Sequence, residues 1–241
     1  MTRLFQAIPL SLHITVTLDP SASHHLANVL RTTVGEPVTL FNGEGGEYAG
    51  TIHRIDKKQV IVKITEFIER EAESPLQLTL AQGISRGEKM DYTIQKAVEL
   101  GVKTIVPLIT ERCNVKLDAQ RWQKRLQHWQ AIIISACEQS GRNRVPEITP
   151  PQPLAEWLPT VTSDVRFVLS PHTKSTAIMA DIASITLLVG PEGGLSEKEM
   201  VIAKQYHFSS IQLGPRILRT ETAAVAAIAA IQSQLGDMKF V

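Results

Sequence analysis

The stretch "LLVGPEGGLSEKEM", residues 187–200, runs from an apolar strand-like segment through a glycine-rich turn into the expected start of a helix. Ser196 and Glu199 have the spacing of a capping box, in which each side chain binds the backbone of the other, so we expect the helix to begin at Ser196. The glycines of the turn precede this helix and can let a ligand approach the backbone closely. They are Gly190, Gly193 and Gly194.

A phosphate site is the first interpretation of such a turn, because the backbone N–H groups at a helix start attract anions. The chain contains neither a Walker A nor a GxGxxG pattern. Glu192 stands in the middle of the turn and would repel a triphosphate, and the next lysine is Lys198. Taken alone, the turn is better explained as a tight structural connection than as a ligand site.

A second glycine turn follows one strand later, in "LGPRILRTETAAVAAIAAIQ", residues 213–232. Thr220 or Thr222 could cap the helix that begins here, but capping does not account for all the polar residues. The helix itself consists almost wholly of Ala, Val and Ile, so we expect it to be buried against a sheet or another subunit. The polar residues before it are Arg216, Arg219, Thr220, Glu221 and Thr222.

From residue 76 onward, strands and helices alternate, which predicts a parallel α/β sheet with ligands at the carboxyl ends of its strands. The expected helices cover 85–101, with a capping box formed by Ser85 and Glu88, and 118–141. The proline-rich segment 146–159 is expected to be a surface connection. The expected strands are 76–83, 103–110, 165–170, 185–190 and 210–214.

Residues 12–67 instead show short strands separated by turns, with one short helix expected in "SHHLANVLR" and a hairpin at "NGEGG". This pattern predicts a small β-barrel. The polar segment "IEREAESP" reads as a linker that ends at Pro75. We therefore predict two domains, residues 1–70 and residues 76–241.

The formal net charge of +1 over 241 residues gives no general argument for nucleic-acid binding, but the stretch 86–144 is distinctly basic. That stretch is either a solvated helix face or a phosphate-facing patch. No apolar run is long enough for a signal peptide or a membrane span, so a cytoplasmic protein is expected. Cys113 and Cys137 lack metal-ligand spacing, which predicts reduced structural thiols and no metal site.

The two glycine turns together, "LLVGPEGGLSEKE" and "LGPRILRTETAA", resemble the C-terminal signatures of SPOUT-class RNA methyltransferases, specifically the 16S ribosomal RNA (uracil-N3)-methyltransferase family. The segments "HHLANVLR" and "GEPVTLFNGEG" look like that family's N-terminal PUA-like β-barrel, and "SRGEKMDYTIQKAVELGV" looks like its central part. The resemblance implies a SPOUT domain with a trefoil-knotted parallel sheet, a homodimer, and S-adenosyl-L-methionine as the cofactor.

The implied reaction is methyl transfer to N3 of a uridine in 16S ribosomal RNA of the small subunit, without a metal. On this basis Arg219 would orient the uracil, Glu221 would accept a proton or orient Arg219, and Arg3 would reach the RNA or a partner subunit's site. The implied cofactor-binding residues are Leu169, Ser170, His172, Gly190, Glu192, Gly193, Gly194, Leu213, Gly214, Ile217, Leu218 and Thr220.

Basic residues near helix starts and in the basic stretch are the expected RNA contacts, because arginine binds phosphate through two parallel hydrogen bonds. The candidate RNA contacts are His25, Arg31, Arg86, Lys89, Arg142, Arg144 and Arg216.

Two other functions stay open: a ribose 2′-O-methyltransferase of the same class, and a non-catalytic RNA-binding factor in ribosome assembly.

Overall fold

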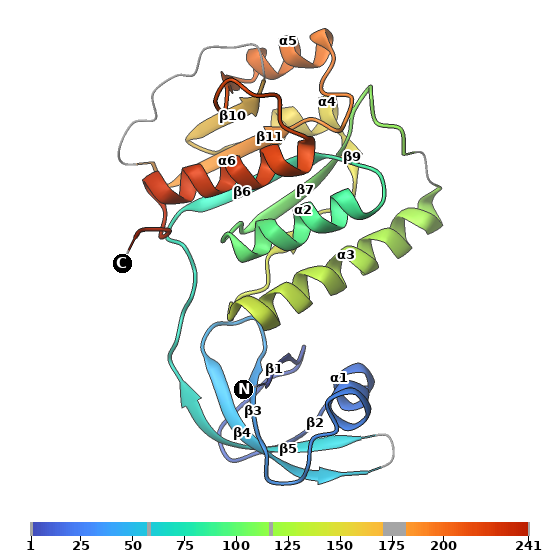
Figure 1. The fold of residues 1–241 in the computed structure, drawn as a ribbon, viewed down its shortest axis with the longest axis vertical. Coiled ribbons are helices and arrows are strands. Elements are labelled where there is room, and N and C mark those ends of the chain that lie inside the picture. Colours follow the sequence, from blue (N-terminus) through green and yellow to red (C-terminus); the bar gives the residue numbers. More distant parts are fainter. Residues whose placement is uncertain (1, 57–58, 116–117, 171–181, 241) are drawn as a thin grey trace. The chain divides into compact units, whose positions relative to one another are not determined.

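A computed structural model describes residues 2–56, 59–115, 118–170 and 182–240 (Figure 1). The chain divides into two compact units, the first made of residues 1–73 with 137–145 and the second of residues 74–136 with 146–241. The sequence predicted a division between residues 70 and 76. It did not predict that residues 137–145 would belong to the first unit.

The first unit is built on a five-stranded sheet with the strand order β1-β3-β4-β5-β2. β1 and β3 are parallel, whereas the other neighbours are antiparallel. The predicted "NGEGG" hairpin is confirmed, because it joins β3 to β4. The short helix expected in "SHHLANVLR" is split into α1 (Pro20–His24) and a π-helical turn, η1 (His25–Leu30). The strands are β1 (Thr2–Phe5), β2 (Thr15–Thr17), β3 (Pro37–Phe41), β4 (Glu47–Ile55) and β5 (Val60–Ile68).

Alternation along β5 shows how the sequence forms this sheet. Val60, Val62 and Ile64 are fully buried, while Lys63 between two of them is exposed. Since successive side chains of a strand point to opposite faces, one face of β5 packs into the core and the other meets solvent.

Residues 137–145 are held to the first unit by polar contacts. The guanidinium of Arg3 donates to Oδ1 of Asn143 at 2.7 Å, and Nδ2 of Asn143 donates to the carbonyl of Arg70 at 2.6 Å. The Arg70 guanidinium in turn donates to the carbonyl of Gly141 at 2.8 Å. Buried polar groups require such partners, and these partners come from the N-terminal sequence.

The second unit is a sheet in which every recorded strand pair is parallel, which confirms the predicted α/β class. The strand order is β12-β10-β11-β6-β7-β8, with β9 also paired to β7. The strands are β6 (Gln77–Gly83), β7 (Thr104–Ile109), β8 (Glu147–Ile148), β9 (Gln152–Pro153), β10 (Val165–Leu169), β11 (Ser184–Val189) and β12 (Ser209–Ile211).

Helices cover both faces of this sheet. On one face α2 (Glu88–Glu99) and α6 (Thr220–Leu235) pack side by side, with α3 (Ala119–Ser140) next to α2 (Figure 1). On the other face lie α4 (Leu154–Trp157), the 3-10 turn η2 (Leu158–Thr160) and α5 (Glu197–Gln205). In the part of the chain that the structure describes, no helix is long and apolar enough to cross a bilayer. The trefoil knot stays a prediction.

The expectation that residues 146–159 form a surface connection is wrong. Leu154, Trp157 and Leu158 are buried in one apolar cluster together with Ala203 and Phe208. The prolines break the segment into pieces too short for a periodic pattern, yet each piece contributes apolar side chains to the core.

The start of α2 also differs from the expectation. The helix begins at Glu88 with Gly87 as its N-cap, at φ 55°, and no side chain caps it. Ser85 is buried and is not the cap residue. Spacing alone therefore misplaced this helix start by one turn.

The two cysteines differ in their expected reactivity. Both thiols are free, Cys113 is half-buried, and the side chain of Cys137 is fully buried. Burial raises the pKa of the Cys137 thiol to about 12, so the reactive thiolate is nearly absent at neutral pH.

We expect iodoacetamide to modify Cys113 and spare Cys137 in the native protein, and to modify both after denaturation. Peptide mass spectrometry checks this, and equal rates for both thiols in the native protein would contradict it.

Candidate active site

Both glycine turns emerge at the carboxyl edge of the parallel sheet. The first, residues 190–195, follows β11, and the second, residues 212–219, follows β12. Strand β10 lies between β11 and β12 and contacts both. Parallel sheets bind their ligands at this edge, so the predicted site residues in the two turns lie where a ligand is expected.

A hydrogen-bonded group joins the first turn to the start of α6. The Thr220 hydroxyl donates to the Gly190 carbonyl at 2.6 Å. Nε2 of Gln82, at the end of β6, lies 3.3 Å from the same carbonyl and 3.1 Å from the Thr220 hydroxyl. Arg219 is the N-cap of α6 and makes no capping bond through its side chain. The Thr220 hydroxyl therefore connects two loops instead of capping its own helix.

Glu192 binds the loop that precedes α2. Its carboxylate accepts a hydrogen bond from the Arg86 backbone N–H at 3.1 Å and forms an ion pair with Lys89 at 3.4 Å. Burial by itself would raise the pKa of Glu192, but the backbone N–H groups and Lys89 outweigh burial and hold that pKa below its usual value. Glu192 thus stays ionised and fixes the turn to its neighbour.

The loop after β7 contributes a contact that the sequence reasoning missed. The Arg112 guanidinium donates to the Gly193 carbonyl at 2.9 Å. Gln82 was missed as well. Gln82 ends β6, and Arg112 lies in the loop after β7. Because ligands bind at the carboxyl ends of parallel strands, this position could have marked both residues as site candidates from the sequence.

The predicted start of α5 is confirmed. The Glu199 backbone N–H donates to the Ser196 hydroxyl at 3.2 Å, and the Ser196 N–H donates to the Glu199 carboxylate at 2.8 Å. These are the two reciprocal bonds of a capping box. The capping prediction failed at Ser85 and succeeded here although the residue spacing is the same.

The three predicted catalytic residues occupy different settings. Arg219 is exposed at the start of α6, and within the described ranges its guanidinium has no hydrogen-bond or ion-pair partner. Glu221 follows in the first turn of α6, with its Oε2 buried and unpaired among the residues described. Arg3 belongs to the first unit, where its guanidinium forms an ion pair with Glu47.

The predicted cofactor residues surround the two turns, except for His172, which lies outside the described residues. The Ser170 N–H, just after β10, donates to the carbonyl of Ile211 in β12 at 3.0 Å. Ile217 is 80% exposed. Leu169, Leu213 and Leu218 are half-buried, and Gly214 is exposed.

The predicted RNA contacts are accessible with one clear exception. Arg142 is 3% exposed and is paired with Glu73 at 2.6 Å, so its guanidinium does not face solvent. Arg144 is exposed and paired with Glu71 at 2.7 Å. Lys89 is half-buried on Glu192. The exposed members of the set are His25, Arg31, Arg86, Arg144 and Arg216.

Comparison with known proteins covers nearly the whole chain. Residues 72–232 match an RNA methyltransferase domain, and residues 18–65 match an RNA methyltransferase PUA domain. The ribosomal RNA small subunit methyltransferase E of Buchnera aphidicola is 38% identical over 98% of this chain and 97% of its own length. The protein of the same name from Bacillus subtilis is 30% identical over 91% of this chain and 90% of its own length.

Solved structures give the same result. A ribosomal RNA small subunit methyltransferase E from Neisseria gonorrhoeae, bound to S-adenosyl methionine, superposes with a TM-score of 0.92 at 42% identity, covering 99% of this chain and 100% of that one. A Legionella pneumophila protein in complex with the same cofactor gives a TM-score of 0.96 at 41% identity, covering 98% and 99% of the two chains. The chain belongs to the ribosomal RNA small subunit methyltransferase E family.

Proposed function

We propose that this protein transfers a methyl group from S-adenosylmethionine to N3 of a uridine in the 16S ribosomal RNA of the small ribosomal subunit. The observation that carries the proposal is the Thr220–Gly190 hydrogen bond, which joins the two glycine turns at the carboxyl edge of the sheet. Relatives with the same fold bind S-adenosylmethionine, and the named relatives are small-subunit ribosomal RNA methyltransferases. We place this activity in the cytoplasm, where ribosomal subunits are assembled.

The chemistry of the turns fits this cofactor. Gly194 and Gly214 have φ values of 68° and 64°, and space is open beside their Cα atoms. Among the residues that the structure describes, a Cβ built on Gly194 meets no atom within 4 Å, and one on Gly214 meets only Arg216, at 3.9 Å. The buried oxygens Oε1 of Gln82 and Oε2 of Glu221 lack partners in the described part of the chain. Such acceptors suit a ligand that carries amino and hydroxyl donors and a positive charge.

When bound, S-adenosylmethionine supplies an electrophilic methyl group on a sulfonium. The uracil must lose its N3 proton before or during attack, which leaves negative charge on the imide. The unpaired guanidinium of Arg219 is the group that would stabilise this charge and orient the base. Glu221, two residues further along the chain, would accept the proton or hold Arg219 in position.

Exposed basic side chains in both units support RNA binding. In the second unit, Arg86 and Arg216 are exposed on the loops that carry the candidate site. In the first unit, His25, Arg31 and Arg144 are exposed. Because phosphate contacts provide affinity and base contacts provide specificity, these basic side chains would position the RNA, leaving base selection to the pocket.

The direct test is methyl transfer from tritium-labelled S-adenosylmethionine. The purified protein is incubated either with small subunits from cells that lack this enzyme or with naked 16S RNA, and label in the RNA is counted. We expect incorporation that saturates near one methyl group per RNA, and the two substrates show which form the enzyme uses. Tight RNA binding without any incorporation would instead support a non-catalytic assembly factor.

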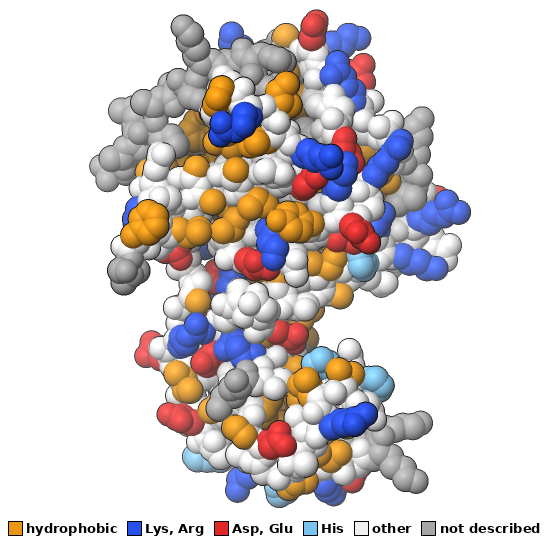
Figure 2. Space-filling view, viewed as in Figure 1, with side chains coloured by type: hydrophobic (Ala, Val, Ile, Leu, Met, Phe, Trp, Pro, Cys, Tyr) orange, Lys and Arg blue, Asp and Glu red, His pale blue; other side chains and the backbone are white. Residues whose placement is uncertain are grey.

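We also propose a homodimer that packs through α6. One side of α6 is buried through Ala224, Ala227 and Ile228, while Ala223 and Ala226 are only half-buried although they too are apolar. Figure 2 shows apolar side chains gathered over α6 and α2. Small side chains allow close approach of two helices related by a two-fold axis.

Light scattering at micromolar concentration is expected to give the mass of two chains. Ala226→Arg, which puts a charge on that side of α6, is expected to give one chain with an unchanged circular dichroism spectrum. A wild-type protein with the mass of a single chain would contradict the dimer.

A further inference from the structure

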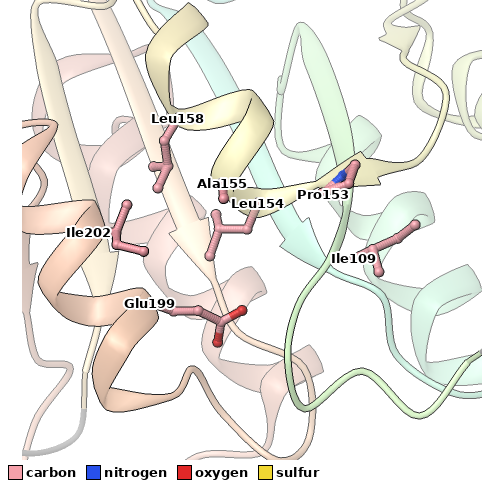
Figure 3. Close-up of a pocket in the computed structure, with 7 residues that line it drawn as sticks. All are labelled: Ile109, Pro153, Leu154, Ala155, Leu158, Glu199 and Ile202. Carbon is pink, nitrogen blue, oxygen red and sulfur yellow. The ribbon is translucent and has the colours of Figure 1, made fainter.

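Glu199 makes one hydrogen bond more than helix capping requires. Glu199 is 9% exposed, and each oxygen of its carboxylate accepts a different backbone N–H. Oε2 accepts from Ser196 at 2.8 Å, which is the capping bond, and Oε1 accepts from Glu111 at 2.7 Å. Figure 3 shows the Glu199 side chain reaching from α5 toward the loop that follows β7. The second bond therefore joins α5 to another part of the sheet edge.

The loop that receives this bond is a tight turn. It is closed by a hydrogen bond from the Cys113 N–H to the Thr110 carbonyl at 3.0 Å, with Glu111 and Arg112 in the middle. Arg112 extends from this turn and donates to the Gly193 carbonyl. Glu199 fixes the backbone directly before Arg112, and Arg112 holds the glycine turn. Because β6 separates β7 from β11 in the sheet, this bridge spans a full strand.

The surroundings make the Glu199 contact hard to replace. Glu199 lines a cavity of about 140 Å³, and the other lining residues are all apolar. A polar group without a partner is costly in such surroundings, and a hydrogen bond there is strong. The other lining residues, drawn as sticks in Figure 3, are Ile109, Pro153, Leu154, Ala155, Leu158 and Ile202.

We propose that Glu199 is a positioning residue for the cofactor-binding turn, acting through Glu111 and Arg112 on Gly193. This proposal rests on the proposed function, with Gly193 among the residues expected to bind S-adenosylmethionine. A turn that is already held in its binding conformation loses less freedom when the ligand binds, so affinity rises without a new ligand contact. Glu199 itself does not touch the reacting atoms.

Glu199→Gln tests this role with almost no change in volume. An amide has one acceptor oxygen, so it can satisfy either the Ser196 N–H or the Glu111 N–H, while its NH2 group faces the other donor. We expect the Kd for S-adenosylmethionine to rise about tenfold, because the loosened glycine turn must then be ordered when the cofactor binds. At saturating cofactor, kcat should stay within about twofold of the wild-type value, since the chemical groups are unchanged.

Two further variants separate positioning from helix stability. Ser196→Ala removes the capping hydroxyl but leaves the Glu199–Glu111 bond, so it should lower the melting temperature with little change in Kd. Arg112→Ala removes the other end of the bridge and should raise Kd by a similar factor to Glu199→Gln. If Glu199 and Arg112 act through one bridge, their effects on Kd are not additive. The Kd of the double variant for S-adenosylmethionine should then be no larger than that of the weaker-binding single variant.

Calorimetry with S-adenosylmethionine measures the wild type first and then the three single variants and the double variant. A wild type that fails to bind overturns the proposed function itself. If the wild type binds, then an unchanged Kd in Glu199→Gln, or effects of the two variants that multiply in the double variant, overturns the positioning role. Should Glu199→Gln fail to fold, Arg112→Ala decides alone, and a wild-type Kd in that variant overturns the role.

Discussion

Arg219→Ala is expected to lower kcat roughly 10²- to 10³-fold, which is the range seen when one group that stabilises transition-state charge is removed. The Kd for S-adenosylmethionine should change by less than about twofold, because the proposed partner of Arg219 is the uracil and not the cofactor. The reason lies in its setting: the guanidinium is exposed at the N-cap of α6 and has no hydrogen-bond or ion-pair partner in the described ranges. Single-turnover methylation combined with calorimetry gives both quantities.

Two variants of the same loop serve as controls. Arg219→Lys keeps the charge but loses the planar pair of donors, so it should recover only part of the rate. Arg216→Ala removes an exposed cation of the same loop that is assigned to phosphate, so it should raise KM for RNA with kcat nearly unchanged. Equal losses of turnover and of cofactor affinity in Arg219→Ala would move Arg219 into the cofactor site.

Arg142→Ala is expected to destabilise the first unit by about 3–5 kcal/mol, because it leaves the buried carboxylate of Glu73 without its partner. The pair is bidentate, with Arg142 Nε 2.8 Å and Nη2 2.6 Å from the two carboxylate oxygens. The exposed fractions of the two side chains are 3% and 9%. All three tryptophans, at positions 122, 129 and 157, lie in the second unit. Hydrogen exchange resolved to peptides of the first unit is therefore a better measurement than fluorescence.

Arg144→Ala is the matched control. It removes a cation two residues away whose partner, Glu71, is on the surface, with exposed fractions of 54% and 39% for the two side chains. Exposed pairs contribute less than about 1 kcal/mol, so protection of the first unit should hardly change. Equal loss of protection in both variants, or none in Arg142→Ala, would contradict the structural role given to Arg142.

The sequence predicted those features that depend on local pattern. The strand segments of the second unit, the "NGEGG" hairpin and the capping box at Ser196 are each specified by residues within a few positions of one another, and each is present. The capping box expected at Ser85 shows the limit of this reasoning. The same spacing occurs there, but Gly87 takes φ 55° and the helix starts after it.

Features that depend on distant contacts could not be predicted in this way. Arg142 looked like an RNA contact because it lies in a basic stretch, and only its pairing with Glu73 shows that it is structural. Gln82 and Arg112 look ordinary in the sequence, since their partners Gly190 and Gly193 follow about a hundred residues later. Glu199 was recognised as a cap, whereas its second bond reaches back to Glu111.

The position of the methyl group on the RNA distinguishes transfer to N3 of uracil from every other methylation. Small subunits methylated by the purified protein are digested to nucleosides, and the methylated nucleoside is identified by mass spectrometry against authentic standards. We expect N3-methyluridine from the wild type and none from Arg219→Ala over the same short incubation. A methyl group on the ribose 2′-oxygen, or on a base other than uracil, would contradict this expectation.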